Sequence, residues 1–221
     1  MSKIMGNKTA LVIGGRKYGT KACQYFKEQK ARVILVDNDP ACKAKGLVAK
    51  NDFVLKDAQD AWDLALKLKP DFIVPTNAGH TCGKWIREYF CLKPLSDSIS
   101  DVTSRLPQSL LLGCDQPNAA LIFSYMAKGK LCREDCPHPP TECALTREPR
   151  PAPLYKLLEY GVFELFDCAR IFVSEQIAPS VGAIKASDFL AFVQEIETKK
   201  PRTLAVGTAC RCHGILNLFK Q

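Results

Sequence analysis

The stretch Thr9-Ala-Leu-Val-Ile-Gly-Gly15, together with Arg32-Val-Ile-Leu-Val-Asp37, decides the fold of this chain. The first is a short apolar run that ends in glycines, and the second is an apolar run that ends in an acid. Between them, residues 18–30 have apolar side chains spaced to share one face of a helix. Strand, glycine turn, helix and strand in this order predict a parallel βαβ unit of the kind that binds nucleotides.

The glycine turn also predicts a ligand site. Glycines permit a tight turn, the helix that follows offers free N–H groups to an anion, and the acid at the end of the second strand can accept hydrogen bonds from ribose. Arg16 and Lys17 stand where a pyrophosphate favours small residues, so NAD(P), another nucleotide and a smaller anion all remain open, as does a turn with no ligand. The candidate ligand-binding residues here are Gly14, Gly15, Arg16, Lys17, Gly19 and Asp37.

A second polar turn follows the next predicted strand, residues 71–75. Because the carboxyl ends of parallel strands meet at one edge of a sheet, Thr76 and Asn77 are expected beside the glycine turn. His80 comes just after them and is a candidate acid–base group or ligand, and His80 and Asn77 are the candidate catalytic residues. The alternative is that His80 only caps the helix predicted over residues 81–90.

Four segments of the first 80 residues resemble one protein family. The segments are Ala10-Leu-Val-Ile-Gly-Gly-Arg-Lys-Tyr-Gly-Thr-Lys-Ala-Cys23, Val33-Ile-Leu-Val-Asp-Asn-Asp-Pro40, Lys45-Gly-Leu-Val-Ala-Lys-Asn-Asp-Phe-Val54 and Pro70-Asp-Phe-Ile-Val-Pro-Thr-Asn77. They resemble the domain that precedes the catalytic part of ATP-grasp ligases, notably the pyrrolysine-biosynthesis and carbamoyl-phosphate types. The resemblance implies a Rossmann-like sheet whose strand ends form part of a substrate site. It also implies that a ligand is faced by Gly14, Gly15, Asp37, Thr76 and Asn77. No segment after these residues resembles an ATP-grasp catalytic domain, so the resemblance does not extend to ligase activity.

A different chemistry is indicated by Cys132-Arg-Glu-Asp-Cys-Pro-His-Pro-Pro-Thr-Glu-Cys143, in which three thiols and the imidazole of His138 lie within twelve residues. The prolines hold the backbone extended, so the sulfurs can converge on one soft metal. The closing segment 210–213, Cys-Arg-Cys-His, can complete the site. The candidate metal ligands are Cys132, Cys136, Cys143, Cys210, Cys212 and His213.

The spacing of these cysteines suits both zinc and iron–sulfur clusters. Two features favour a [4Fe–4S] cluster. The chain has more thiols than one zinc ion needs, and the segment 210–213 lacks the C-x2-C knuckle of zinc ribbons. Zinc remains the alternative, and reduced cysteines without metal are the third reading. Three cysteine ligands would leave one iron open to a substrate, whereas four would close the cluster.

Composition and charge narrow the class of protein. The chain has 221 residues and is 47% hydrophobic, which is enough to bury a core. Eleven cysteines indicate disulfides only in a short secreted chain, and residues 1–8 lack the apolar core of a secretion signal, so we expect reduced thiols in the cytoplasm. No run approaches the roughly 18 apolar residues of a membrane span.

The net charge of +8 comes from one quarter of the chain. Residues 1–56 hold 12 Lys and Arg against 4 Asp and Glu, and the remainder holds 19 of each. Such a charge attracts anionic ligands, although it also suits solvated helix faces. No basic run is interleaved with aromatic residues, which argues against a nucleic-acid partner.

The fold class predicted from these patterns is α/β, with a Rossmann-like, mostly parallel sheet, helices on both faces and a Cys/Pro-rich loop insertion at residues 128–153. We expect a ligand-binding domain over residues 1–107 and a C-terminal α/β part over 108–221. Further helices are predicted over 57–68, 119–127, 154–160 and 187–197, and further strands over 109–113, 170–174 and 203–207.

The combined hypothesis is an iron–sulfur protein of an anaerobic cell whose Rossmann-like domain binds an anionic small molecule or a nucleotide. The sequence favours an enzyme of redox or cofactor biosynthesis, with iron–sulfur-dependent redox or lyase-type chemistry. One alternative is a non-catalytic, zinc-stabilised module for nucleotide sensing or scaffolding. Another is a metal-free NAD(P)-dependent oxidoreductase. A homodimer is compatible with each of these.

Overall fold

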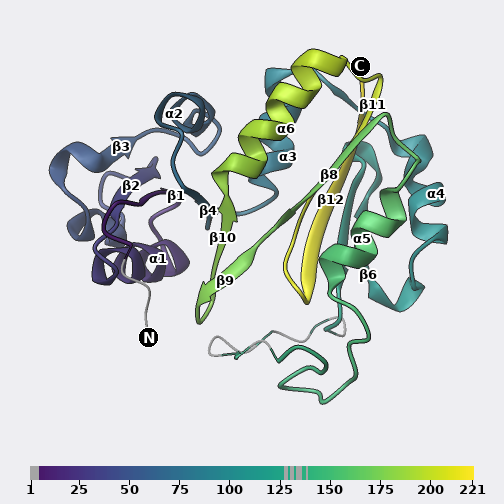
Figure 1. Ribbon diagram of the computed structural model, residues 1–221, viewed down its shortest axis with the longest axis horizontal. Coiled ribbons are helices and arrows are strands. Elements are labelled where there is room, and N and C mark those ends of the chain that lie inside the picture. The colour runs from purple at the N-terminus through teal and green to yellow at the C-terminus, as the bar shows by residue number, and fades with distance from the viewer. Residues whose placement is uncertain (1–4, 127–128, 130–131, 133–135, 138) are drawn as a thin grey trace. The chain divides into compact units, whose positions relative to one another are not determined.

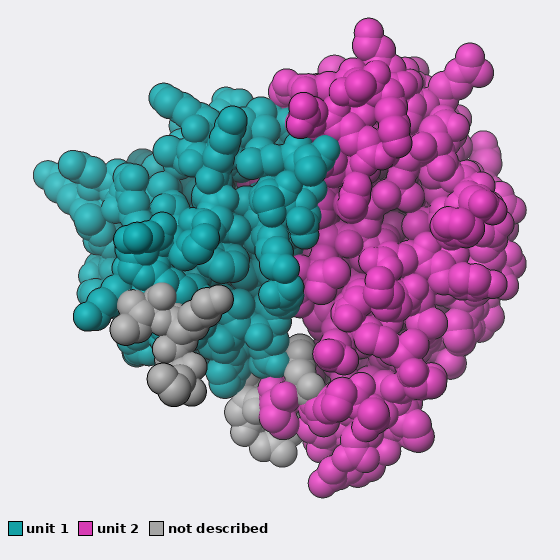
Figure 2. Space-filling view, viewed as in Figure 1, with its two compact units in different colours: residues 1–81, 175–191 teal, residues 82–174, 192–221 magenta. Residues whose placement is uncertain are grey.

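The computed structural model describes residues 5–126, 129, 132, 136, 137 and 139–221. The chain divides into two compact units (Figures 1 and 2). Unit 1 comprises residues 1–81 and 175–191, and unit 2 comprises residues 82–174 and 192–221. The first unit therefore ends before residue 107, where the boundary was expected. Residues 175–191 also belong to unit 1, because two strands of this segment join its sheet.

The sheet of unit 1 is parallel over four of its six strands. Its central strand pairs on both sides, with Leu11 opposite Ile34 in one neighbour and Ile73 in the other. The last two strands form a hairpin that adds to the sheet in the antiparallel direction. In spatial order the strands are β3 (Phe53–Leu55), β2 (Arg32–Asp37), β1 (Thr9–Ile13), β4 (Phe72–Pro75), β10 (Val181–Lys185) and β9 (Glu175–Ala178).

Two helices and two short 3-10 turns complete the first part of unit 1 (Figure 1). Helix α1 (Lys17–Glu28) buries Ala22, Cys23 and Phe26 in the same hydrophobic cluster as Val12, as the spacing in the sequence predicts. The other elements are α2 (Ala61–Leu68), η1 (Lys43–Leu47) and η2 (Lys50–Asp52).

The sheet of unit 2 is mostly antiparallel. Only β8 and β11 pair in the parallel direction. The main path in spatial order is β6 (Leu111–Asp115), β7 (Ala120–Ser124), β12 (His213–Lys220), β11 (Thr203–Ala209) and β8 (Cys168–Val173), and β5 (Lys93–Pro94) pairs with β12. The chain is thus a mixed α/β protein with two mixed sheets, and the expectation of one mostly parallel sheet is wrong for unit 2.

Helix α5 (Leu154–Val162) packs on the sheet of unit 2 and buries Leu154 and Leu158 among Phe123, Leu216 and neighbouring apolar side chains. None of the helices in the described part of the chain is long and apolar enough to cross a membrane. The other helical elements are α3 (Thr81–Tyr89), α4 (Ile99–Ser104), α6 (Ala186–Lys199), η3 (Ser96–Ser98), η4 (Gln108–Leu110) and η5 (Gln116–Asn118).

The expected helix at residues 119–127 is instead the strand β7. Leu121 and Phe123 are buried while Ile122 between them is exposed, so the apolar pattern has the period of a strand. Ala119 just before them has a left-handed backbone, φ 45°, that ends the preceding turn and redirects the chain. The strands β9, β10 and β12 were not anticipated.

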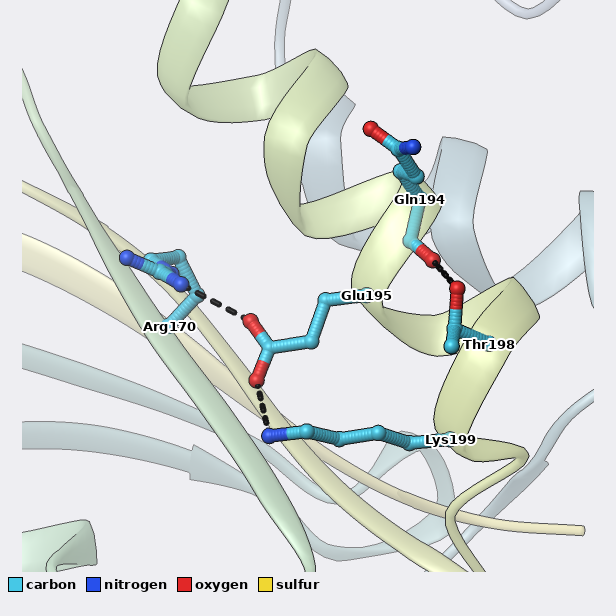
Figure 3. A network of polar contacts seen from close by, with 5 residues as sticks. All are labelled: Arg170, Gln194, Glu195, Thr198 and Lys199. Carbon is cyan, nitrogen blue, oxygen red and sulfur yellow. Dashed lines mark hydrogen bonds and ion pairs between the residues drawn. The ribbon is translucent and has the colours of Figure 1, made fainter.

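An ion-pair network joins β8 to α6 within unit 2 (Figure 3). The carboxylate of Glu195 accepts from Arg170 Nη2 at 2.8 Å and from Lys199 Nζ at 2.7 Å, and Thr198 Oγ1 donates to the Gln194 carbonyl at 2.8 Å. Both cationic side chains are exposed, so water screens the two ion pairs and they add little to stability. The network links the strand to the helix and has a structural character.

The close approach of α1 to the glycine turn yields a stability prediction. A Cβ at residue 19 would lie 1.8 Å from the carbonyl oxygen of Gly14, so Gly19→Ala must push the helix away from the turn. We expect a loss of about 1–3 kcal/mol in the free energy of unfolding, measured by urea denaturation. Gly46→Ala is the control because a Cβ there meets nothing within 4 Å. Equal stabilities of the two variants would contradict this packing.

Candidate metal centre and ligand pocket

The turn between β11 and β12 gathers three candidate metal ligands. The ladder between β11 and β12 ends at the pair Ala209–Gly214, so residues 210–213 connect the two strands, with His213 also the first residue of β12 through its pairing with Ser124 of β7. A hydrogen bond of 2.9 Å from Cys210 N–H to the His213 carbonyl closes this turn. Cys210 Sγ lies 3.8 Å from His213 Nδ1, and these two atoms and Cys212 Sγ all lie within 4.8 Å of one another. A sequence of four residues therefore presents two sulfurs and one nitrogen to a common point.

The polypeptide also favours a thiolate in this turn. The backbone N–H groups of Cys212 and His213 each donate to Cys210 Sγ at 3.3 Å. A hydrogen bond from the Cys212 thiol is the main influence that lowers the pKa of Cys210, while burial opposes it. The same hydrogen bond, with burial, raises the pKa of Cys212. The turn thus stabilises negative charge on the Cys210 sulfur through its own hydrogen bonds.

A second sulfur with backbone donors comes from a small hairpin over residues 141–150. Cys143 N–H donates to the Glu148 carbonyl at 2.9 Å, and Arg147 N–H donates to the Cys143 carbonyl at 2.9 Å. Burial would raise the pKa of the Cys143 thiol, but hydrogen bonds from the Thr146 hydroxyl and from the N–H groups of Thr146 and Leu145 hold it below its usual value. Hydrogen bonds of this kind to sulfur tune metal–thiolate sites.

The two cysteine-bearing segments meet in unit 2. The Cys132 and Cys136 thiols are hydrogen-bonded, and burial, with charge on the nearby Cys136, Cys143 and Cys210, raises the pKa of Cys132 to about 11. Charge on Cys132 likewise raises the pKa of Cys212. Among the described residues, only Cys210, Cys212 and His213 have ligand atoms within 4.8 Å of one another, and Cys132, Cys136 and Cys143 lie outside that group. His138 lies outside the described residues.

Backbone hydrogen bonds fix the two segments to each other. Leu154 N–H donates to the Arg211 carbonyl at 2.9 Å, and Tyr125 N–H donates to the Cys212 carbonyl at 3.0 Å. The Tyr125 hydroxyl reaches the Ala152 carbonyl at 2.7 Å. The turn at residues 210–213 is held from both ends of the cysteine-rich loop, so the shape of the site is set by main-chain contacts.

Sequence reasoning missed Arg150, which is 4% exposed beside these sulfurs. Its Nη1 donates to Cys212 Sγ, and its Nη2 donates to the Pro139 carbonyl at 2.7 Å. The backbone N–H of Arg150 donates to the Thr141 carbonyl at 2.7 Å. An arginine between two prolines carries no signal of burial, so only the fold reveals it.

The sulfur-rich donor set suits a soft metal. Cys136, Cys143 and Cys212 are buried, whereas Cys132, Cys210 and His213 are partly exposed. Thiolates bind zinc, copper(I) and iron–sulfur clusters, and an imidazole is acceptable to several of these metals. All cysteines of the chain are free thiols in the structure, so the sulfurs are available as ligands.

Unit 1 has a separate pocket of about 300 Å³ at the carboxyl ends of β1, β2 and β4. Its wall combines a cation, Arg16, with the acids Asp37 and Asp57, and Asn38 Nδ2 donates to Asp57 Oδ1 at 2.7 Å. The residues that line it are Gly14, Arg16, Val36, Asp37, Asn38, Asp57, Ala58, Thr76, Asn77 and Ala78.

Asp37 proves to shape the turn. Gly15 N–H donates to Asp37 Oδ2, and Asp39 N–H donates to Oδ1 at 2.7 Å. Asp37 is buried and each of its carboxylate oxygens accepts a backbone N–H, whereas Asn38 and Asp57 on the same pocket wall are exposed. The Thr76 hydroxyl lies 2.9 and 2.7 Å from the carbonyl oxygens of Ile13 and Gly14 and ties the two turns together.

The remaining predicted ligand residues divide into two groups. Gly14, Arg16, Asp37, Thr76 and Asn77 line the pocket. Gly15, Lys17 and Gly19 do not, and the two glycines serve the packing of the turn. His80 is 7% exposed, immediately before α3, and is also absent from the pocket wall. Asn77 Oδ1 accepts from the Thr81 hydroxyl at 2.8 Å, next to His80.

Two family domains match the chain. The domain AF_1314_C, described as "Uncharacterized protein, C-terminal domain", matches residues 82–221, and AF_1314_N, described as "Uncharacterized protein, N-terminal domain", matches residues 9–80. A relative from Archaeoglobus fulgidus, described as "Uncharacterized protein", is 25% identical over 222 residues, covering 96% of this chain and 99% of its own. No solved structure matches the chain. The chain belongs to the family defined by the AF_1314_C domain.

Proposed function

We propose that unit 2 is an iron–sulfur module in which the loop 132–143 and the turn 210–213 jointly hold one [4Fe–4S] cluster. The observation that carries the proposal is the group of Cys210, Cys212 and His213, whose ligand atoms lie within 4.8 Å of one another, in a turn that backbone hydrogen bonds and Arg150 fix to the loop. The loop adds Cys132, Cys136 and Cys143, so that five sulfurs are candidate ligands. Backbone N–H donors to Cys143 and Cys210 add to it, since they offset thiolate charge. Five sulfurs exceed the four that close a cubane, which favours electron transfer over Lewis-acid chemistry.

Zinc is the second candidate, and a specific observation favours it. The donor atoms of Cys210, Cys212 and His213 lie within 4.8 Å of one another, a spacing that also suits a single ion with tetrahedral ligands. One further sulfur from the loop would complete such a site. Zinc would act structurally there, by tying the loop to the β11–β12 turn.

We further propose that unit 1 is a Rossmann-like module that binds a nucleotide or a related anion. In the parallel strand order β3-β2-β1-β4, the chain adds β2 and β3 on one side of β1 and then β4 on the other side. The pocket lies at this switch point, where ligands bind in open α/β sheets. Arg16 and the N-terminus of α1 suit a phosphate, while Asn38 and Asp57 suit hydroxyl groups.

Metal content tests the first proposal. We expect anaerobically purified protein to be brown, with iron and acid-labile sulfide, and Cys136→Ser to lose most of both because a buried ligand is removed. Cys114→Ser is the matched control, since that thiol is exposed on β6 and distant in sequence from the site. The measurement is iron, zinc and sulfide per chain, with a visible spectrum.

Three results of that measurement carry different meanings. A colourless protein with one zinc per chain would replace the cluster with the zinc alternative. A protein with neither metal after anaerobic reconstitution would contradict the metal centre altogether. Equal metal content in the two cysteine variants would exclude Cys136 as a ligand.

Thermal stability tests the pocket of unit 1. We expect ATP, NAD or NADP to raise the melting temperature of the protein, because a ligand at 100 times its Kd stabilises the bound state by about 2.7 kcal/mol. Arg16→Ala should reduce this shift by removing the cation at the pocket wall. Lys27→Ala, at an exposed position in the last turn of α1, should leave it unchanged. No shift with any of the three nucleotides would count against a nucleotide site.

A further inference from the structure

Arg150 is a buried cation whose side chain has no ion pair with a carboxylate among the described residues. Its side chain donates to a candidate ligand sulfur, Cys212 Sγ, and to the Pro139 carbonyl. A charge taken out of water is costly unless an opposite charge lies near it. The neighbouring groups able to supply that charge are the clustered sulfurs, because metal binding deprotonates the thiols it recruits.

The third nitrogen of the guanidinium adds an independent observation. Arg150 Nε is fully buried and has no hydrogen-bond partner in the described structure. A buried donor without an acceptor is destabilising, because it has lost its hydrogen bonds to water and gained none in return. An iron–sulfur cluster brings sulfides that can accept hydrogen bonds, whereas a zinc ion brings none, so this donor favours the cluster between the two candidates of the proposed function.

We propose that Arg150 is the built-in counter-ion of an anionic metal–thiolate centre and raises the reduction potential of a cluster held there. The inference rests on the proposed metal site. A single electron added to the cluster makes it more negative, no bond is formed or broken, and a fixed cation close to a ligand sulfur favours that reduced state. Arg150 is a positioning and tuning residue, and the ligands remain the cysteines.

Two arginines of one hairpin provide a matched test. Arg150→Met removes the buried charge and keeps an apolar stem, whereas Arg147→Met removes an exposed arginine whose side chain is 75% accessible and pairs with Glu142. Arg150→Lys retains a charge without the planar fork. Each protein is loaded with the cluster anaerobically, its iron and sulfide are counted, and it is titrated with dithionite as the one-electron reductant.

We expect Arg150→Met to keep the cluster and to show at least a tenfold lower ratio of reduced to oxidised cluster at a fixed potential, a negative shift of about 59 mV or more. Arg150→Lys should shift less, and Arg147→Met should match the wild type. If Arg150→Met folds but loses the cluster while Arg150→Lys retains it, the need for charge is also supported. Loss in both variants alike, or a wild-type potential in Arg150→Met, overturns the inference.

The same variants separate this inference from the proposed function. If the wild type binds zinc, the zinc affinity is measured by competition with a chelator, in place of the reduction potential. Arg150→Met should then bind zinc at least tenfold more weakly than Arg147→Met. Equal zinc affinity overturns the role of Arg150 and leaves a zinc site standing. A wild type that binds no metal overturns the proposed function, and the inference falls with it.

Discussion

The register of the β11–β12 hairpin is the constraint on which unit 2 depends. Seven residue pairs, from Thr203–Lys220 to Ala209–Gly214, fix where the ladder ends, so the turn must contain residues 210–213 and no others. A shift by one residue would send alternate side chains to the opposite face of a sheet whose inner face is fully buried at Leu216 and Leu218. Core packing thereby fixes the place of the cysteines in the turn.

The second requirement is electrostatic. Several sulfurs and one guanidinium share a region with limited access to water, where neutral thiols and an isolated cation are poorly matched. Backbone N–H groups at Cys143 and Cys210 favour thiolates, and Arg150 favours a negative total charge. These groups come from different elements of the fold, and all of them favour negative charge at the sulfurs. A metal–thiolate centre would supply that charge, whereas a purely apolar core would not.

Much of unit 1 could be predicted from the sequence because its signals are local. Apolar runs ending at Gly14 and Asp37 specify parallel strands, and β1, β2, β4 and α1 lie close to where they are expected. Unit 2 was less accessible because its strands pair over long distances. The run Ala120–Ser124 is short and is compatible with either a helix or a strand, and β12 begins within the cysteine motif at residues 210–213, so no separate turn signal marks its start. The closeness of Cys210, Cys212 and His213 follows from their spacing in the sequence, whereas Arg150 and the pair Asn38–Asp57 were not anticipated, since neither has a motif.

A crystal structure of the anaerobically purified protein, with anomalous diffraction recorded at the iron and zinc absorption edges, tests the central claim most directly. The account predicts one anomalous peak in unit 2 with bound sulfurs from both the loop 132–143 and the turn 210–213, and with Arg150 beside it. Cysteines of only one segment at the metal, or no peak among these sulfurs, would contradict it.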